Sequence, residues 1–234
     1  PETVHFSRKE ILDITKIQKM TIDVSVYLDV VSQGELELYA QIKFINGMSS
    51  SDIQDALIKT AVEKIDIDVP NWTFVAARLF VFDLYHRVGK ATHGIKGEPY
   101  CHLKDYLKYG KDAGRLIPNL GEGYDLDELN SYIDPKRDFL FNYLGIKTLY
   151  DRYLIKNNQA QPIELPQHMF MAIAMFLAQD EKNKQQCAKE FYDVISKFEV
   201  MLATPTLSNA RTNRHQLSSC YIGSSPDNIE GIFD

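Results

Sequence analysis

The chain has 234 residues, of which 44% are hydrophobic, so it can bury the core of one large domain or of two small ones. Its formal net charge of −6 makes it a poor candidate for sequence-independent binding of nucleic acid, which depends on Lys and Arg contacts to phosphate. No apolar run is long enough to cross a bilayer, and the N-terminus lacks the apolar stretch of an export signal.

Capping signals and hydrophobic periodicity predict a helical N-terminal third. Residues 72–88 are apolar almost throughout, which is typical of a buried helix. The predicted helices begin at Asp13, run from Ser32 to about Phe44, run from a capping box at Ser51 to Pro70, and span residues 72–88.

Residues 89–99 contain three glycines and a proline, a composition that fits a linker between two domains, residues 1–90 and 91–234, which the resemblance described below favours. A longer loop inside one domain is the alternative. Further helices are predicted over residues 100–110, 125–132, 136–156, 166–179 and 181–198, and another helix begins near residue 225. Residues 169–177 are apolar and should form the central core.

The segment from residue 203 to residue 222 differs from the helical pattern before it. Its first part crowds hydroxyl and amide side chains around Pro205 without a helical period, which predicts a loop whose donors suit an anion. Residues 216–222 then alternate between two faces, which predicts a strand carrying Cys220. A thiol beside hydroxyl groups suggests a phosphorylated substrate held near a reactive cysteine.

The cysteines also limit the compartment and the kind of site. Cys101, Cys187 and Cys220 are odd in number and far apart, so they are not a disulfide framework and indicate a reducing cytoplasm. The chain has no C-x-x-C, and Cys101 next to His102 lacks the other ligands of a zinc site. We expect a cytoplasmic protein that binds no metal ion, nucleic acid or membrane.

Two sets of motifs resemble the large subunit of class I ribonucleotide reductases. The first resembles the start of the catalytic barrel and comprises Thr204-Pro205, Ser208, Arg211-Thr212 and Gln216-Leu217-Ser218-Ser219-Cys220. The second, within residues 11–88, resembles the ATP-cone, a regulatory nucleotide-binding module. It comprises Asp13-Ile14-Thr15-Lys16-Ile17, Ser32-Gln33, Gln41-Ile42-Lys43-Phe44, Gly47, Ser50-Ser51-Asp52-Ile53 and Ala76-Ala77-Arg78-Leu79.

The resemblance implies a mainly α fold: an ATP-cone-like helical domain, then a helical domain that leads into the first strand of a ten-stranded α/β barrel. It implies reduction of ribonucleoside diphosphates to deoxyribonucleotides. Cys220 would be one thiol of a redox pair, and Thr204 and Ser219 would bind the nucleoside diphosphate substrate. Asp227, with Asn228 and Ile229, would bind the effector of the specificity site, although Asp227 also fits a helix N-cap.

In the cone, the positions implied to contact ATP or dATP are Glu10, Lys16 and Ser50. The sequence departs from the family where a Lys-Arg pair is expected, because Val4 and His5 stand there. His86 is a further candidate that would compensate in part for the missing charge. A folded cone that binds no nucleotide is the alternative.

The implied partners are nucleoside triphosphate effectors, a second large subunit, thioredoxin or glutaredoxin as reductant, and a metal-containing small subunit that supplies the radical. Because this chain carries one half of a redox pair, we expect it not to turn over alone. One alternative is a non-catalytic helical module that binds a nucleotide or a partner. Another is a cobalamin-dependent or glycyl-radical reductase of the same superfamily.

Overall fold

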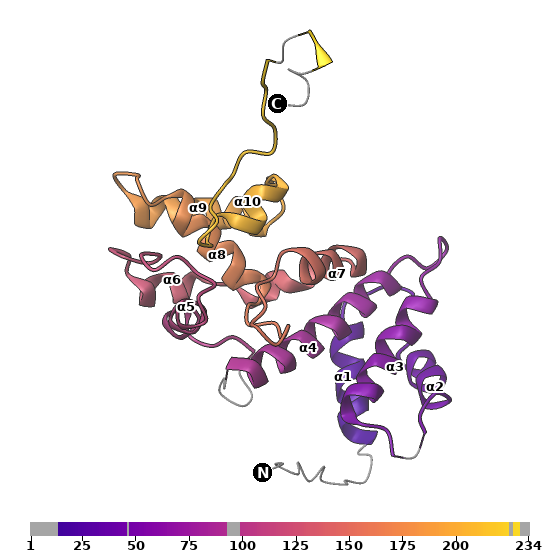
Figure 1. The fold of residues 1–234 in the computed structure, drawn as a ribbon. Helices are drawn as coiled ribbons and strands as arrows, with labels where there is room; N and C mark the ends of the chain where they lie inside the picture. The colour runs from indigo at the N-terminus through magenta and orange to yellow at the C-terminus, as the bar shows by residue number, and fades with distance from the viewer. Residues whose placement is uncertain (1–13, 46, 93–98, 225–226, 230–234) are drawn as a thin grey trace, which may run out of the picture.

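The computed structural model describes residues 14–45, 47–92, 99–224 and 227–229. Over these residues the chain is built from helices, which confirms the predicted mainly α class (Figure 1). The elements are α1 (Ile14–Ser25), α2 (Gln33–Gln41), α3 (Ser50–Glu63), α4 (Trp72–Thr92), α5 (Leu103–Asp112), α6 (Leu126–Tyr132), the 3-10 helix η1 (Pro135–Leu140), α7 (Tyr143–Arg152), α8 (Pro166–Leu177), α9 (Lys184–Ser196) and α10 (Thr204–Asn209).

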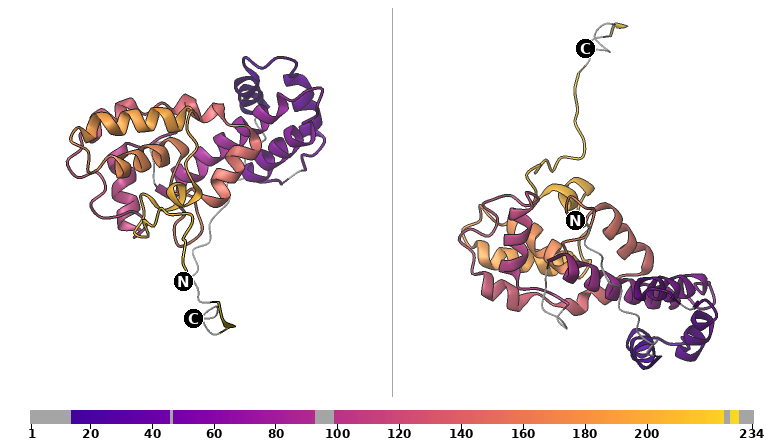
Figure 2. Two further views of the ribbon diagram at one scale, coloured as in Figure 1. Left: turned by 90° about the horizontal axis from the view of Figure 1, so that it is seen from above. Right: turned by 60° about the horizontal axis from the view of Figure 1, so that its bottom comes forward.

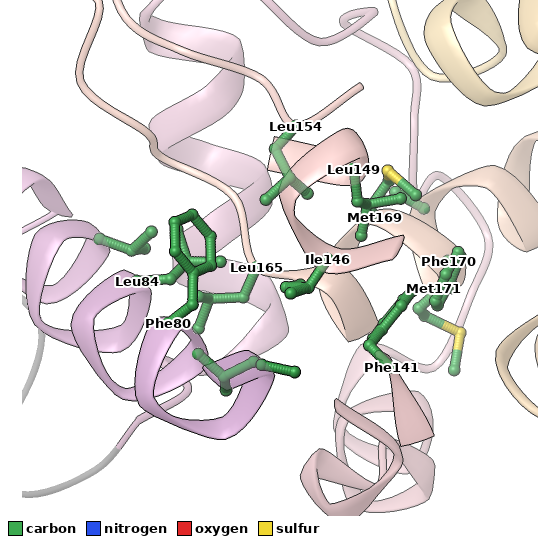
Figure 3. Close-up of a cluster of buried hydrophobic side chains, with 14 of the residues drawn as sticks. Phe80, Leu84, Phe141, Ile146, Leu149, Leu154, Leu165, Met169, Phe170 and Met171 are labelled. Atoms are coloured by element: carbon green, nitrogen blue, oxygen red, sulfur yellow. The ribbon is translucent and has the colours of Figure 1, made fainter. Parts of the chain in front are cut away.

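The α8 helix is the centre of the larger part of the structure, as its apolar sequence predicts. Pro166 occupies its first turn, where a missing N–H costs nothing, and the side chains from Met169 to Phe176 are all buried. They pack against α9 and η1. Figure 3 shows Met169, Phe170 and Met171 in one apolar cluster with leucine, isoleucine and phenylalanine side chains of α4 and α7. Burying apolar surface of this extent is the main force that holds the helices together.

The α4 helix joins this core to the N-terminal helices. One side of α4 packs against α1 and α3, and another packs against α7 and η1. Figures 1 and 2 show α1 to α3 at one end of α4 and the remaining helices at the other. The helix continues through Gly89 to Thr92, so the predicted domain boundary at residue 90 falls inside it. No helix among the described residues combines the length and the hydropathy needed to cross a bilayer.

Several predicted helix ends in the N-terminal part are wrong, among them the end of the third helix, which lies at Glu63 and not at Pro70. The third helix is capped by Ser49 and not by Ser51, because Ser49 and Asp52 exchange side-chain to backbone hydrogen bonds in a capping box. Gln54 instead donates to the carbonyl of Leu79 on α4, at 2.8 Å. The second helix ends at Gln41, after which the backbone turns through short-range bonds before it reaches Phe44.

The helix predicted over residues 136–156 is two elements, η1 and α7. Asp134 caps η1, and Asn142 opens α7 by accepting a hydrogen bond from the Gly145 N–H at 2.7 Å. An Asx cap inside an apolar run restarts the helix in a new direction. The helices predicted over residues 100–110, 125–132, 166–179 and 181–198 are confirmed as α5, α6, α8 and α9 with shifted ends.

The C-terminal segment differs most from its prediction. Residues 204–209 form α10 in place of a loop, since Pro205 in the first turn suits a helix start. Residues 216–222 form no strand, because among the described residues there is no neighbouring strand to pair with. The chain instead runs away from the helices, with residues 218–224 exposed (Figures 1 and 2).

A buried carboxylate links four elements of the core. Asp138 of η1 is fully buried and accepts hydrogen bonds from the Tyr85 and Tyr100 hydroxyls, at 2.8 and 2.6 Å, and from the Gln167 amide at 2.8 Å. Tyr192 of α9 completes the cluster by donating to the Gln167 carbonyl oxygen at 2.8 Å. Burial raises the pKa of Asp138 to about 6, although the three donors oppose the shift.

This pKa predicts a pH-dependent effect of Asp138→Asn. An unfolded Asp titrates near about 3.9, so native Asp138 holds its proton up to a higher pH, and stability is lost as the pH rises from about 4 to above 6. The substitution removes this loss. We expect the unfolding free energy of Asp138→Asn relative to the unsubstituted chain to increase by up to about 3 kcal/mol between pH 4 and pH 7.

Urea unfolding at a series of pH values measures this difference. Asp23→Asn, at an exposed position of α1, is the matched control and should show no such trend. A difference for Asp138→Asn that stays constant from pH 4 to pH 7 would contradict the assignment.

Candidate functional site

The polar segment after α9 is anchored to the core by a fully buried ion pair. Both side chains, Arg211 and Glu164, have no exposed surface. The Arg211 Nε and Nη2 atoms donate to the two oxygens of Glu164, each at 2.6 Å, in a bidentate pair. Burial alone would lower the pKa of Arg211, but the charge and hydrogen bonds of Glu164 outweigh it and raise the pKa. The Arg211 guanidinium therefore stays charged.

Glu164 and Arg211 also make hydrogen bonds to other parts of the chain. Glu164 also accepts from the Tyr106 hydroxyl on α5 and from the Ile155 N–H at 2.9 Å. Arg211 donates to the carbonyls of Leu207 at 2.6 Å and Tyr153 at 2.9 Å. Because this guanidinium is committed to Glu164 and to backbone carbonyls, it is not available to neutralise a phosphate.

An aromatic stack connects this pair to the Asp138 cluster. The His168 ring lies parallel to the Tyr106 ring at 4.6 Å and meets the Tyr100 ring edge-on at 4.7 Å. Its Nε2 atom is 3.1 Å from the Cys101 carbonyl oxygen, while its Nδ1 atom has no partner among the described residues. Burial lowers the pKa of His168 to about 3, so the ring is neutral at physiological pH.

The predicted substrate residue Thr204 begins α10 with an exposed side chain. Its hydroxyl oxygen lies 3.2 Å from the Tyr153 hydroxyl oxygen. The α10 helix is fixed behind it by the buried Leu207, whose carbonyl Arg211 binds. A hydroxyl is thus presented to solvent from a firmly held element, which suits the recognition of an anionic group.

The structure does not place Cys220 beside Thr204. The chain leaves the helices after Leu217, which packs against the core, and Asn209 holds the preceding residue by donating to the Gln216 carbonyl at 2.9 Å. Ser219 and Cys220 are neighbours on the exposed segment, with their Oγ and Sγ atoms 3.8 Å apart. The two predicted site residues therefore lie apart, the Thr204 hydroxyl on a held helix and the Cys220 thiol on an exposed segment.

The other cysteines differ from Cys220 in exposure. Cys101 and Cys187 are half-buried, and burial raises the pKa of the Cys101 thiol to about 11. A thiol with a raised pKa carries little thiolate, the reactive form, at neutral pH.

The predicted effector residues lie on the surface. Asp227, Asn228 and Ile229 are exposed, beyond the extended segment. Glu10 lies outside the described residues, as do Val4 and His5. Across the described ranges, no three His, Cys, Asp or Glu side chains gather as metal ligands would.

Three of the cone candidates are exposed on three different helices, Lys16 on α1, Ser50 on α3 and His86 on α4. The Asp55 carboxylate of α3 lies 3.7 Å from the Arg87 guanidinium of α4, which brings the start of α3 beside the second half of α4. Ser50 and His86 therefore lie towards the same end of this helix pair. His86 has its Nδ1 atom 2.9 Å from the Phe82 carbonyl oxygen.

Sequence reasoning missed Glu164, Tyr106 and Tyr153 as parts of this site. A signal for Glu164 was available, because a single carboxylate between Ile163 and Leu165 is flanked by apolar residues and needs a buried partner. No local pattern pairs it with a residue 47 positions away. The two tyrosines carry no signal of their own, since the chain has 13 of them.

Comparison with known proteins identifies what this arrangement is similar to. Residues 139–215, which include Glu164, Thr204 and Arg211, match the family described as "Ribonucleotide reductase, all-alpha domain". The ribonucleoside-diphosphate reductase subunit alpha of Helicobacter pylori is 61% identical over 227 residues, covering 97% of this chain and 28% of that protein.

Similarity extends to more distant bacteria. The subunit alpha of Treponema pallidum is 37% identical over 178 residues, covering 76% of this chain and 21% of that protein. The reductase 1 subunit alpha of Escherichia coli is 31% identical over 228 residues, covering 95% of this chain and 29% of that protein. The chain thus spans less than a third of the length of these relatives.

The buried ion pair predicts a large effect of Arg211→Met. The substitution leaves the Glu164 carboxylate buried without its counter-ion, which costs about 3–5 kcal/mol of unfolding free energy. Adding Glu164→Gln should recover part of the loss, because a neutral amide tolerates burial better than an uncompensated charge.

Urea unfolding of the two variants tests this, with Arg214→Met as the control. Arg214 is exposed and lies three positions after Arg211. Loss of its side chain should change the unfolding free energy by less than about 0.5 kcal/mol. Equal effects of Arg211→Met and Arg214→Met would show that the pair does not stabilise the fold.

Proposed function

Since the chain belongs to the family of ribonucleotide reductase large subunits, we propose that it works as the N-terminal portion of an enzyme that reduces ribonucleoside diphosphates to 2′-deoxyribonucleoside diphosphates. The observation that carries this proposal is the 61% identity to a ribonucleoside-diphosphate reductase subunit alpha over 97% of the chain. A similarity of that extent includes both parts of the structure, the N-terminal helices and the α8-centred core.

Cys220 is the redox residue of this proposal. Two thiols lose two electrons and two protons and become a disulfide, while the ribose exchanges its 2′-hydroxyl for hydrogen and water leaves. The Cα atoms of the two cysteines must come within about 4.4–6.8 Å of each other. The exposed position of Cys220 leaves it free to meet a second cysteine in the rest of the subunit. Thioredoxin or glutaredoxin would reduce the disulfide again, and a metal-containing small subunit would supply the radical.

Thr204 and Ser219 bind the phosphates of the nucleoside diphosphate in this proposal. Both hydroxyls are exposed, and Ser219 adjoins Cys220. Because Arg211 is paired with Glu164, its guanidinium cannot contact the phosphates directly. This supports binding of the phosphates by hydroxyl and backbone N–H donors. The segment from residue 216 to residue 222 would become the first strand of the barrel once it has a strand to pair with.

Nucleotide effectors act at two further places. Residues 1–90 form the ATP-cone, in which Glu10, Lys16, Ser50 and His86 contact ATP or dATP. Residues 91–234 form the helical domain and the start of the barrel, where Asp227, Asn228 and Ile229 bind the specificity effector of a homodimeric large subunit. The exposure of the cone and specificity candidates among the described residues supports these effector sites, because an effector can reach them. The enzyme would work in the cytoplasm.

The redox role predicts the result of Cys220→Ser in the complete large subunit, assembled with its small subunit. Turnover of the nucleoside diphosphate should fall by about 10³-fold or more, because serine cannot supply reducing equivalents. Substrate binding, measured by equilibrium dialysis, should change little. Cys187→Ser on α9 is the control and should retain activity. Normal turnover by Cys220→Ser would exclude the redox role.

A further inference from the structure

The Tyr153 side chain lies beside Thr204, the predicted phosphate ligand. Tyr153 directly follows α7, and its N–H donates to the Leu149 carbonyl at 2.9 Å. Its own carbonyl accepts from Arg211 at 2.9 Å, and its hydroxyl oxygen is 3.2 Å from the Thr204 hydroxyl oxygen. Both the backbone and the side-chain end of this residue are therefore held.

Arg211 holds together the two chain segments that carry these hydroxyls. Its guanidinium binds the carbonyl of Tyr153 and, at 2.6 Å, the carbonyl of Leu207 in α10, the helix that Thr204 begins. The guanidinium is itself held by the two oxygens of Glu164. One buried cation thus ties the end of α7 to α10, and the contact between Tyr153 and Thr204 forms on the solvent side of this tie.

The chemistry of the hydroxyls gives this contact a direction. A threonine hydroxyl has one hydrogen to donate and two lone pairs to accept with. A phosphate oxygen only accepts, so Thr204 must donate to it and must accept from Tyr153. Hydrogen bonds in such a chain polarise one another, which strengthens the donor that faces the anion.

We propose that Tyr153 is a positioning residue for the nucleoside diphosphate: its hydroxyl donates to Thr204 and orients the Thr204 hydroxyl hydrogen towards a phosphate oxygen. This inference rests on the proposed function, because it takes Thr204 as a phosphate ligand. Tyr153 itself does not touch the substrate. Tyr153 therefore affects how the phosphate group is bound and does not affect how the base is recognised.

The test is Tyr153→Phe in the complete large subunit assembled with its small subunit. The KM for the nucleoside diphosphate should rise about three- to tenfold, which is the effect of one hydrogen bond, with kcat within about twofold. The KM should rise by the same factor for ADP, CDP, GDP and UDP. The variant removes one oxygen from a partly exposed side chain and leaves its backbone contacts in place, so the fold is retained; thermal unfolding checks this.

Tyr150→Phe is the matched control, because it makes the same change in α7, three positions before Tyr153. Its ring packs against Phe80 at 5.4 Å, but its hydroxyl has no hydrogen-bond partner within the described part of the chain. The KM of this variant should be unchanged. An equal rise in KM for Tyr150→Phe and Tyr153→Phe would overturn the proposal.

Thr204→Ala and the double variant distinguish the positioning role of Tyr153 from the substrate-binding role of Thr204. Thr204→Ala should raise the KM at least as much as Tyr153→Phe, and adding Tyr153→Phe to it should change nothing more. If Thr204→Ala leaves the KM unchanged, the substrate role of Thr204 itself is wrong. If Thr204→Ala raises the KM and Tyr153→Phe does not, or if the two effects multiply, the positioning role of Tyr153 is wrong while that of Thr204 stands.

Discussion

The ion pair between Arg211 and Glu164 is the constraint on which the site depends. Taking both charges fully out of water costs several kcal/mol per ion, and their attraction repays that cost only with good geometry and full hydrogen bonding. The structure supplies both, through the bidentate contact and the additional bonds to Tyr106, to Ile155 and to the carbonyls of Leu207 and Tyr153. These partners lie on three separate stretches of chain, α5, residues 153–155 and α10, so the pair can be fully bonded only when all three are in place.

The hydrogen bonds of the buried ion pair add to an apolar core that by itself specifies the orientation of the helices less strictly. The α8 helix is buried on nearly every side, and an apolar surface of that kind packs against neighbouring helices in more than one orientation at similar cost. The Asp138 cluster and the Arg211 pair flank α8, and the rings of Tyr100, His168 and Tyr106 connect them. Misplacing a helix would leave a buried charge or hydroxyl without a partner, which is far more costly than an imperfect apolar contact.

Sequence predicted the elements better than their connections. The helices α5, α6, α8 and α9 follow from periodicity and caps, because those signals lie within a few residues of each other. The break between η1 and α7 was missed, since Asn142 caps a helix only once the preceding turn has formed. At the candidate site, Thr204 and Cys220 were predicted through a family resemblance and stay predictions. Glu164 and Tyr153 were not predicted, because their partners are 47 and 51 residues away.

The division of the site into a fixed part and an exposed part follows from the same physics. Thr204 is held because α10 is tied to buried side chains, whereas Cys220 lies past Leu217, the last partly buried residue before an exposed stretch. Residues 216–222 have the alternation of a strand, and a strand gains its stability from pairing. The helical body therefore sets the position of the Thr204 hydroxyl, the proposed phosphate ligand, but it does not set the position of the thiol. If Cys220 approaches a second cysteine within disulfide distance, as we propose, its position is set by the strands with which residues 216–222 pair and not by the helices.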